Sequence, residues 1–297
     1  MGKSFAIYTT YYPGVEKYLP EWRESLLAQT DLNASVCIGV DGKDSGHVGE
    51  MLGPQVSPQF FLAMPDETPS SLRSRVLEIL SSEFDAVILT DMDDILLPTR
   101  IAIAKEQLSK CDLSCCAMQV MDVDRIVNNA IFDPSLWGAD PVRRNVFGLS
   151  NTAWQSHLLK KCLPVPSNYR LMDWLIAIRA RAEGALIQYD SKPRMIYRQH
   201  PNNIARILPP FSTEQVLQGC YLILEHYDFI LEESFWRYPH ISSEIKIAKQ
   251  LAKDFQSALG SSRSVLINYT NALNQIPPNY VWWDFIANPK LESIWKN

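Results

Sequence analysis

Apolar runs alternate with helical segments over the first hundred residues, and this alternation constrains the fold more than any other feature. The runs Phe5–Tyr12, Val36–Val40 and Ala86–Leu89 have the length of strands, whereas the segment 16–29 repeats its large apolar residues at helical spacing. Another strand is expected at 59–64, followed by a helix over about 71–82 with Ser70 or Ser71 as its cap. Because parallel strands need crossover connections, the pattern predicts an α/β fold with a mainly parallel sheet flanked by helices.

Beyond residue 100 the order is less regular. The pattern predicts a helix at 101–109, a strand at 113–123, a loop-rich stretch at 127–145, a helix at 172–183, and strands at 185–189 and 195–197. From Pro209 onward the chain reads as helical, with one segment from Ser212 or Thr213 to about 232 and another at 243–259 that Gly260 would stop. We therefore expect an α/β domain over residues 1–205 and a C-terminal helical extension over residues 206–297.

An acidic cluster, Asp91-Met92-Asp93-Asp94, directly follows the apolar run that ends at Leu89. Because side chains alternate along a strand, Asp91 and Asp93 should project from one side of the chain as it leaves the sheet. Carboxylates so close raise each other's pKa unless a cation neutralises them, and oxygen ligands suit Mg²⁺ or Mn²⁺ rather than zinc. The cluster predicts a divalent-cation site with positions left for phosphate oxygens, and a solvated acidic loop is the alternative.

A second carboxylate, Asp41, follows the strand expected at 36–40, much as Asp91 follows a later one. In open α/β sheets, ligands bind in the crevice outside the carboxyl ends of the strands. Two acidic residues at the same edge of one expected sheet therefore predict a binding site at that edge.

Composition limits the class of protein. The chain has 297 residues, 46% of them hydrophobic, and a net charge of -5, which suits a substantial core plus one extension. Lys and Arg are scattered, which argues against a nucleic-acid partner. Neither a membrane-spanning run nor a signal-peptide pattern is evident, so we expect a cytoplasmic protein. The six cysteines show no zinc-ligand spacing and are expected to be buried thiols.

Short motifs follow one another in an order that points to a known family. In chain order they are Phe5–Tyr12, Ser25–Thr30, Val40–Gly42, Leu72–Arg75, Asp91–Asp94, Met172–Trp174 and Tyr197–His200. This set resembles the family-2 inverting nucleotide-sugar glycosyltransferases of the GT-A fold, particularly bacterial cell-surface polysaccharide and rhamnosyl-transferring members. The resemblance covers about residues 4–205 and rests on the order and spacing, since each motif alone is weak.

The resemblance implies a role for each site residue. Asp91 and Asp93 would hold ribose and metal as a DxD motif, and His200 would be a third metal ligand or a diphosphate contact, unless it is a hydrogen-bonded structural residue. The nucleotide-binding set that it implies is Thr9, Tyr11, Asp41, Arg75, Asp91, Met92 and Arg198. Asp173 would be the catalytic base that takes the proton of the acceptor hydroxyl. The alternative for Asp173 is a helix N-terminal charge favoured by the helix dipole.

The function implied by the resemblance is a metal-dependent inverting glycosyltransferase of the hexosyltransferase type. Its cofactor would be Mn²⁺ or Mg²⁺, its donor a nucleotide diphosphate sugar, and its acceptor a glycan or a lipid-linked hydroxyl, which leaves open a peripheral contact with the inner face of the membrane. The Gln-x-x-Arg-Trp signature of processive synthases is absent, which implies one transfer per encounter. The aromatic tail with Trp282, Trp283 and Phe285 would complete the core, close over the acceptor or pack a homodimer.

Two other functions remain to be weighed. A non-catalytic GT-A-like carbohydrate-binding or scaffold protein would keep the acidic cluster as a remnant, although the presence of Asp173 argues against this reading. A sugar-nucleotide pyrophosphorylase would use a related sheet and metal, but its glycine-rich N-terminal phosphate loop is missing from this sequence.

Overall fold

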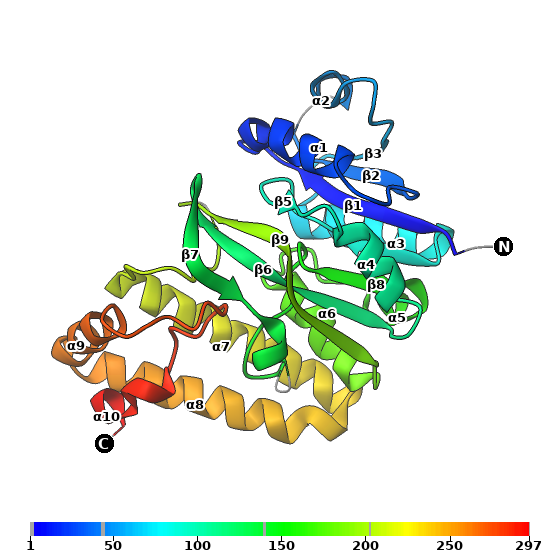
Figure 1. Cartoon of the computed structure of the whole chain (residues 1–297). Coiled ribbons are helices and arrows are strands. Elements are labelled where there is room, and N and C mark those ends of the chain that lie inside the picture. Colours follow the sequence, from blue (N-terminus) through cyan, green and yellow to red (C-terminus); the bar gives the residue numbers. More distant parts are fainter. Residues whose placement is uncertain (1–2, 43–44, 139–140, 202, 297) are drawn as a thin grey trace. The chain divides into compact units, whose positions relative to one another are not determined.

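The computed structural model describes residues 3–42, 45–138, 141–201 and 203–296 (Figure 1). The chain forms two compact units. The sheet unit comprises residues 1–136 and 147–198, and the helical unit comprises residues 137–146 and 199–297. The short segment 137–146 thus belongs with the C-terminal residues, from which it is distant in the sequence.

The sheet unit is built on one sheet with nine strands in the described part of the chain, in the order β3-β2-β1-β4-β8-β6-β9-β5, with β7 paired to β6. The strands are β1 (Phe5–Tyr11), β2 (Ser35–Val40), β3 (Gln59–Leu62), β4 (Ala86–Leu89), β5 (Ile95–Leu96), β6 (Leu113–Asp122), β7 (Arg125–Phe132), β8 (Thr152–Gln155) and β9 (Ile187–Gln199). Strands β3, β2, β1 and β4 run parallel, whereas β8 pairs antiparallel with both β4 and β6. The α/β prediction is confirmed, with an antiparallel part that the crossover argument did not specify.

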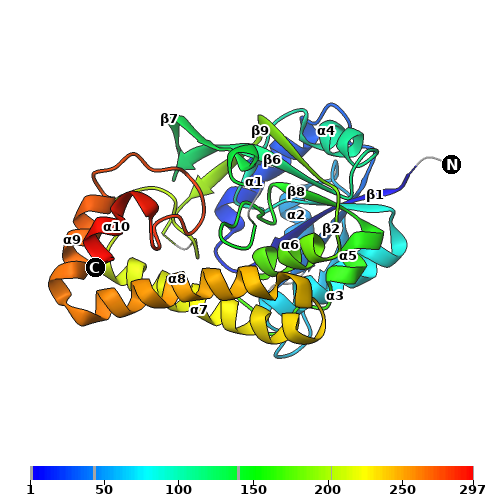
Figure 2. The same ribbon diagram turned by 90° about the horizontal axis from the view of Figure 1, so that it is seen from below.

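Helices cover both faces of this sheet. The helices of the unit are α1 (Leu19–Leu27), α2 (Ser45–Leu52), α3 (Pro69–Glu83), α4 (Arg100–Gln107), α5 (Ser156–Cys162) and α6 (Met172–Ala182). Helices α3, α5 and α6 lie side by side on one face, and α1 and α4 lie on the other (Figures 1 and 2). The central strands are therefore buried from both sides, as the continuous apolar sequence of β4 requires.

The helical unit contains α7 (Thr213–Trp236), α8 (Ser242–Ser261), α9 (Arg263–Leu273) and α10 (Glu292–Trp295). Helices α7 and α8 lie side by side, as Figure 2 shows. Ser212 begins α7 with a capping box, because its side chain accepts from the Gln215 amide while the Gln215 side chain accepts from the Ser212 amide. This confirms the predicted start of the helix. The aromatic residues Trp282, Trp283 and Phe285 are buried.

Some predicted boundaries were wrong for identifiable reasons. Thr68, not Ser70 or Ser71, caps α3: its hydroxyl accepts from the Ser71 amide, and Pro69 takes the first helical position, where a missing N–H costs nothing. Gly260 does not stop α8, which continues through it to Ser261. Strand β7 occupies part of the stretch expected to be loop-rich, and the two strands expected at 185–189 and 195–197 are one strand, β9.

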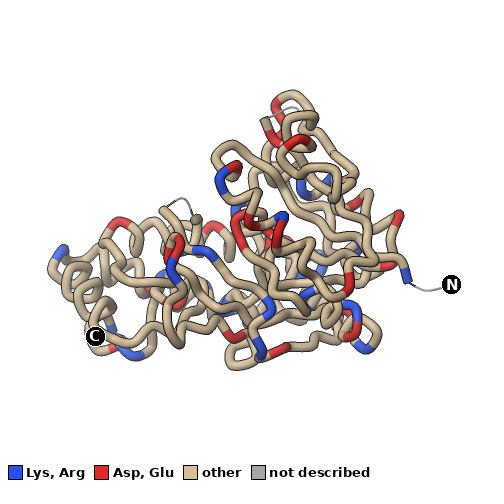
Figure 3. The backbone as a smooth tube through the Cα atoms, turned by 45° about the horizontal axis from the view of Figure 1, so that its top comes forward, with Lys and Arg blue, Asp and Glu red and all other residues tan. Residues whose placement is uncertain are grey.

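Charge and hydropathy agree with the composition. Lys and Arg are dispersed along the described chain and alternate with acidic residues (Figure 3). The described helices include one of 24 residues, α7, yet none of them combines the length and the apolar character that crossing a bilayer requires. All six cysteines are buried thiols, as expected.

Candidate functional site

The acidic cluster forms a turn at the carboxyl end of β4. The Thr90 amide donates to the Tyr8 carbonyl (2.9 Å), which continues the pairing with β1, and the Asp94 amide then donates to the Asp91 carbonyl (3.2 Å). The chain therefore turns at Asp91 instead of extending past it. The sequence argument expected strand alternation to place Asp91 and Asp93 on one side of the chain. In the structure, the turn brings the two residues together instead.

Two acids of this turn are nearly inaccessible to solvent. Asp93 is 8% exposed and Asp94 is 2% exposed. The Arg198 amide donates to Asp94 Oδ1 (2.8 Å), whereas Asp94 Oδ2 is buried with no hydrogen-bond partner among the described residues. Burial, together with the charges of Asp93 and Asp91, raises the pKa of Asp94 well above its ordinary value. An acid in this setting stays protonated more readily than a solvated loop residue does.

Asp91 is half-buried, and its electrostatic surroundings locate its neighbours. Burial raises its pKa to about 7, the charges of Asp93 and Asp173 act in the same direction, and Arg73 acts against them. The charge of Asp173, at the start of α6, thus acts on the Asp91 carboxyl across 82 positions of sequence, as charges do at short range. Three of the predicted acids thus belong to one cluster.

The face of β1 next to this cluster carries hydroxyl groups. Thr10 Oγ1 donates to Tyr8 Oη (3.2 Å), and Tyr12 Oη donates to Asp93 Oδ2 (3.2 Å). A Cβ at Gly39 of β2 would stand 2.8 Å from Tyr8 Oη, so only glycine leaves room for this ring. Tyr8, Thr10 and Tyr12 were not selected from the sequence, although their i, i+2 spacing on a strand could have identified them.

Two arginines of α3 differ in what they contact. Arg73 Nε donates to Thr10 Oγ1 (3.3 Å), next to Asp91. Arg75, which the sequence argument assigned to the nucleotide, makes a two-pronged pair with Glu67 (2.8 and 2.7 Å) and donates to the Leu62 carbonyl (2.9 Å). Arg75 therefore fixes the loop after β3, whereas Arg73 is the α3 cation within the acidic cluster.

Arg198 is buried and directed at protein groups. Its Nε donates to the Asp93 carbonyl (2.8 Å), and its Nη1 donates to the Val123 carbonyl (2.6 Å) and to Asp124 (2.7 Å). It also pairs with Glu21, and its guanidinium lies over the Tyr18 ring, 4.6 Å from the ring centre. The sequence argument left open a phosphate contact or an acidic neighbour, and in the structure Arg198 has two acidic neighbours.

The other predicted site residues lie in several places. Asp41 follows β2 and is half-buried, with its amide donating to the Tyr11 carbonyl (2.9 Å). Tyr11 and Met92 are wholly buried, at 0% exposure, and the buried Thr9 lines a small hollow of ≈ 10 Å³ together with Asp91, Arg73 and Tyr8. His200 belongs to the helical unit, where its amide donates to Asn203 Oδ1 (2.5 Å). Its metal role remains a prediction.

The donor set fits a divalent ion held by few protein ligands. Within the described ranges, no group of three or more His, Cys, Asp or Glu side chains is arranged to hold a metal. Burial raises the pKa of Asp91, and the charge of Asp93 adds to that rise, so positive charge placed next to these two carboxylates would be stabilising. Two hard oxygen donors with open positions suit Mg²⁺ or Mn²⁺ bound together with phosphate, because Mg²⁺ usually takes only one or two carboxylates.

Comparison with known proteins places the fold. Scans of protein-family models and of curated proteins find no match to this chain. Among solved structures, S. aureus TarS 1-349 in complex with UDP-GlcNAc matches at a TM-score of 0.56 and 16% identity, covering 91% of this chain and 87% of that one. The mannosyltransferase PcManGT from Pyrobaculum calidifontis, in complex with GDP-Man and Mn²⁺, matches at a TM-score of 0.50 and 12% identity, covering 92% and 80%. The chain therefore has a GT-A-like α/β fold with C-terminal helices.

Proposed function

We propose that this protein is a metal-dependent inverting glycosyltransferase that moves a sugar from a nucleotide diphosphate sugar to an acceptor hydroxyl. The observation that carries the proposal is the cluster of Asp91, Asp93 and Asp173 at the carboxyl edge of the parallel strands, where α/β sheets bind ligands. The GT-A-like fold supports it, since both similar structures hold nucleotide sugars.

Asp91 and Asp93 would hold the divalent ion, Mn²⁺ or Mg²⁺. When bound, the ion would supply Lewis-acid stabilisation of the charge that collects on the leaving diphosphate. Tyr12 donates to Asp93 and so would hold its carboxylate in one orientation. Arg73, the α3 cation of this cluster, would add positive charge near the diphosphate, whereas Arg75 and Arg198 would act by holding the surrounding loops.

Asp173 would act as the general base. In the transfer, the bond from the sugar anomeric carbon to the β-phosphate oxygen breaks with its electrons passing to the phosphate, and the acceptor oxygen bonds to the same carbon from the opposite face. Asp173 would take the proton that the acceptor hydroxyl loses. It lies in the first turn of α6, where the helix dipole favours a negative charge.

The experiment is a two-stage comparison of wild type with Asp173→Asn. First, thermal shift with UDP, GDP, dTDP and CDP, each with Mn²⁺, identifies the nucleotide, because a ligand that binds the native state raises the apparent stability. Second, release of that nucleotide from its sugar conjugates measures turnover. We expect Asp173→Asn to retain the thermal shift while kcat falls by about 100-fold or more, the usual contribution of a general base.

Two controls make the outcome decisive. Asp190→Asn changes an acid of β9 that pairs with Arg194 (2.7 Å), away from the acidic turn, and should leave kcat unchanged. If none of the four nucleotides stabilises the wild-type chain, the donor assignment is wrong. If Asp173→Asn turns over at the wild-type rate, Asp173 is only a helix N-terminal charge.

A further inference from the structure

A hollow in the helical unit lies outside the acidic site. Its volume is ≈ 270 Å³, and within the described chain its walls come from α7, α8, Arg143 and Arg144, and residues 283–292 after α9. This volume is close to the lower end of the range of about 300–1,000 Å³ that is typical of small-molecule pockets. Its lining includes Arg144, Trp283, Asp284 and Glu292, with Ala248 and Leu251 of α8 forming an apolar part.

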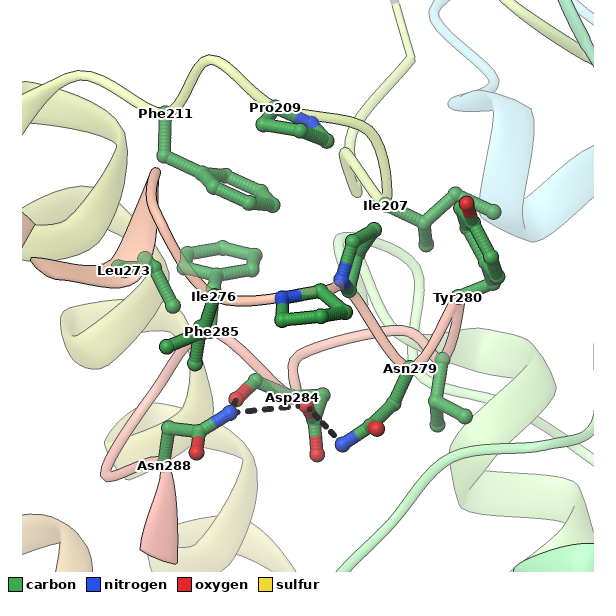
Figure 4. A pocket seen from close by; sticks show the side chains of 13 residues that line it. Ile207, Pro209, Phe211, Leu273, Ile276, Asn279, Tyr280, Asp284, Phe285 and Asn288 are labelled. Carbon is green, nitrogen blue, oxygen red and sulfur yellow. Dashed lines mark hydrogen bonds between the residues drawn. The ribbon is translucent and has the colours of Figure 1, made fainter. Parts of the chain in front are cut away.

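Asp284 is held firmly at the wall of this hollow. Asn279 Nδ2 and Asn288 Nδ2 both donate to Asp284 Oδ2, at 2.9 and 3.0 Å. Figure 4 draws a second pocket that Asp284 also lines, and it shows the two amides on either side of the carboxylate. The other oxygen, Oδ1, has no hydrogen bond to any described residue. Burial raises the pKa of Asp284, and Arg144 and Lys290 act against that rise. One oxygen is therefore used for anchoring, and the other is left to accept from a ligand.

The backbone around Asp284 adopts unusual conformations. Tyr280, Trp283 and Ala287 all have positive φ, at 53°, 67° and 49°. A bulky residue such as tryptophan rarely adopts this region, and residues held in such conformations cluster at binding sites. The buried Tyr269 hydroxyl supports the segment, because it accepts from the Asn288 amide and donates to the Phe285 carbonyl, both at 2.9 Å. The segment is thus rigid as well as strained, which suits a preorganised site.

The charges that line the hollow select the ligand class. The lining includes Arg143 and Arg144 together with Asp284 and Glu292, two residues of positive formal charge and two of negative, so its formal charges balance. An anionic ligand would be repelled by the carboxylates, and a cationic ligand would be repelled by the arginines. A neutral polyol can instead donate hydrogen bonds to the carboxylates and accept them from the guanidinium groups. The indole of Trp283 and the methyl groups of α8 offer apolar surface to the C–H face of such a ligand.

We propose that this hollow is a saccharide-binding site, in which Asp284 Oδ1 accepts from sugar hydroxyls and Arg144 donates to them. The site recognises a neutral, hydroxyl-rich ring and is separate from the acidic cluster of the sheet unit. Saccharide binding itself does not depend on the proposed transferase activity. The identification of the bound saccharide as part of the acceptor glycan does rest on the proposed function.

The test is calorimetric or NMR titration of the nucleotide-free full chain with the methyl glycosides of glucose, galactose, mannose and N-acetylglucosamine at millimolar concentrations. We expect at least one glycoside to bind wild type and Asp284→Asn to weaken it by about tenfold or more, because a donor replaces the free acceptor. The amide oxygen of the new Asn can still accept from Asn279 and Asn288, so the anchoring is retained. Asp254→Asn, at an exposed position on α8, is the matched control and should bind as wild type does.

Two further variants separate the outcomes. Leu251→Trp narrows the hollow from α8 while Asp284 itself is unchanged, and it should abolish binding while the circular dichroism spectrum stays native. Asp91→Asn should leave glycoside binding intact even where it removes nucleotide binding, so failure of the donor site is distinguishable from failure of this one. The inference is overturned if none of the four glycosides binds, if Asp284→Asn and Leu251→Trp both bind normally, or if Asp91→Asn alone removes binding.

Discussion

Arg198 Nε donates a hydrogen bond to the backbone carbonyl of Asp93 (2.8 Å), so the end of β9 is fastened directly to the acidic turn after β4. The Arg198 amide adds a second bond, to Asp94 Oδ1. The turn that carries the proposed metal ligands is thereby held by one buried residue, 105 positions later in the sequence. Arg198 is a positioning residue in this account.

Replacing Arg198 with Met should loosen the turn. Two carbonyls, of Asp93 and Val123, lose their charged donor, and we expect the free energy of unfolding to fall by about 2–3 kcal/mol. The pairs with Glu21 and Asp124 add little, because those side chains are 51% and 77% exposed. Urea denaturation measures the loss. Arg198→Met should also bind nucleotide more weakly than wild type, whereas the control Arg194→Met, on the same strand, should retain nucleotide binding. Equal nucleotide binding by the two variants would show that the contacts of Arg198 with the turn do not matter to the site.

Alanine should have opposite effects at two glycines. At Gly39 a Cβ would stand 2.8 Å from Tyr8 Oη, so we expect a loss of about 1–3 kcal/mol as the ring shifts. At Gly49, within α2, the nearest atoms belong to Phe60 at 3.8 Å, and the better helix propensity of alanine should add up to about 1 kcal/mol. Thermal or urea unfolding of both variants checks the signs. A Gly39→Ala protein as stable as wild type would mean that Tyr8 is not confined as described.

The Tyr12 hydroxyl should matter to binding and not to folding. It donates to the Asp93 carboxylate at Oδ2 (3.2 Å), and a hydrogen bond to a charged group is worth about 1.5–3 kcal/mol. Tyr12→Phe should therefore weaken the Mn²⁺–nucleotide complex by about 10-fold or more. Tyr221→Phe, at an exposed position on α7, is the control. Unchanged affinity in Tyr12→Phe would remove Tyr12 from the site.

His226 should make the protein sensitive to mild acid. Burial in α7 lowers its pKa to about 3, below the ordinary value near 6.5. The unfolded chain then binds more protons than the folded chain between these two values, so stability falls as pH falls below 6.5. We expect a slope of about 1.4 kcal/mol per pH unit between pH 6 and 5 from this residue. His226→Leu should remove that slope, whereas replacing the exposed His240 should not; identical slopes in wild type and His226→Leu would contradict the assignment.

The alternating first hundred residues made the parallel part of the sheet predictable, because β4 is apolar throughout, β2 is apolar after Ser35, and helix α3 between them carries clear periodicity. Strand β7 could not be read in this way. Among the strands of the described ranges it pairs with β6 alone, and its sequence Arg125–Phe132 has exposed polar residues at several positions, so its pattern resembles a loop. The prediction that Gly260 ends helix α8 was wrong for a related reason. The helix is stabilised by packing of its apolar stripe, which includes Ile245 and Phe255, and this packing outweighs the cost of one glycine.

The candidate site was predictable where it depends on local motifs and not where it depends on pairing. Asp91, Asp93 and Asp173 could be selected by residue type and place, and the charges of Asp93 and Asp173 both raise the pKa of Asp91. The partners of Arg75 and Arg198 could not be selected, since Glu67, Asp124 and Glu21 are ordinary surface-type residues in the sequence. The partner of each arginine is determined by the tertiary structure, so it could not be predicted from the sequence around that arginine.

The central claim is that the acidic turn binds a divalent ion that in turn holds the diphosphate of the nucleotide. Electron paramagnetic resonance of Mn²⁺ tests it directly, since the free-ion signal falls as the ion is bound. For wild type we predict that the nucleotide identified by thermal shift tightens Mn²⁺ binding, and that Asp91→Asn and Asp93→Asn each weaken the ternary complex by about 10-fold or more. Nucleotide that binds equally well in the presence of EDTA, or Mn²⁺ binding unchanged in both variants, would contradict the account.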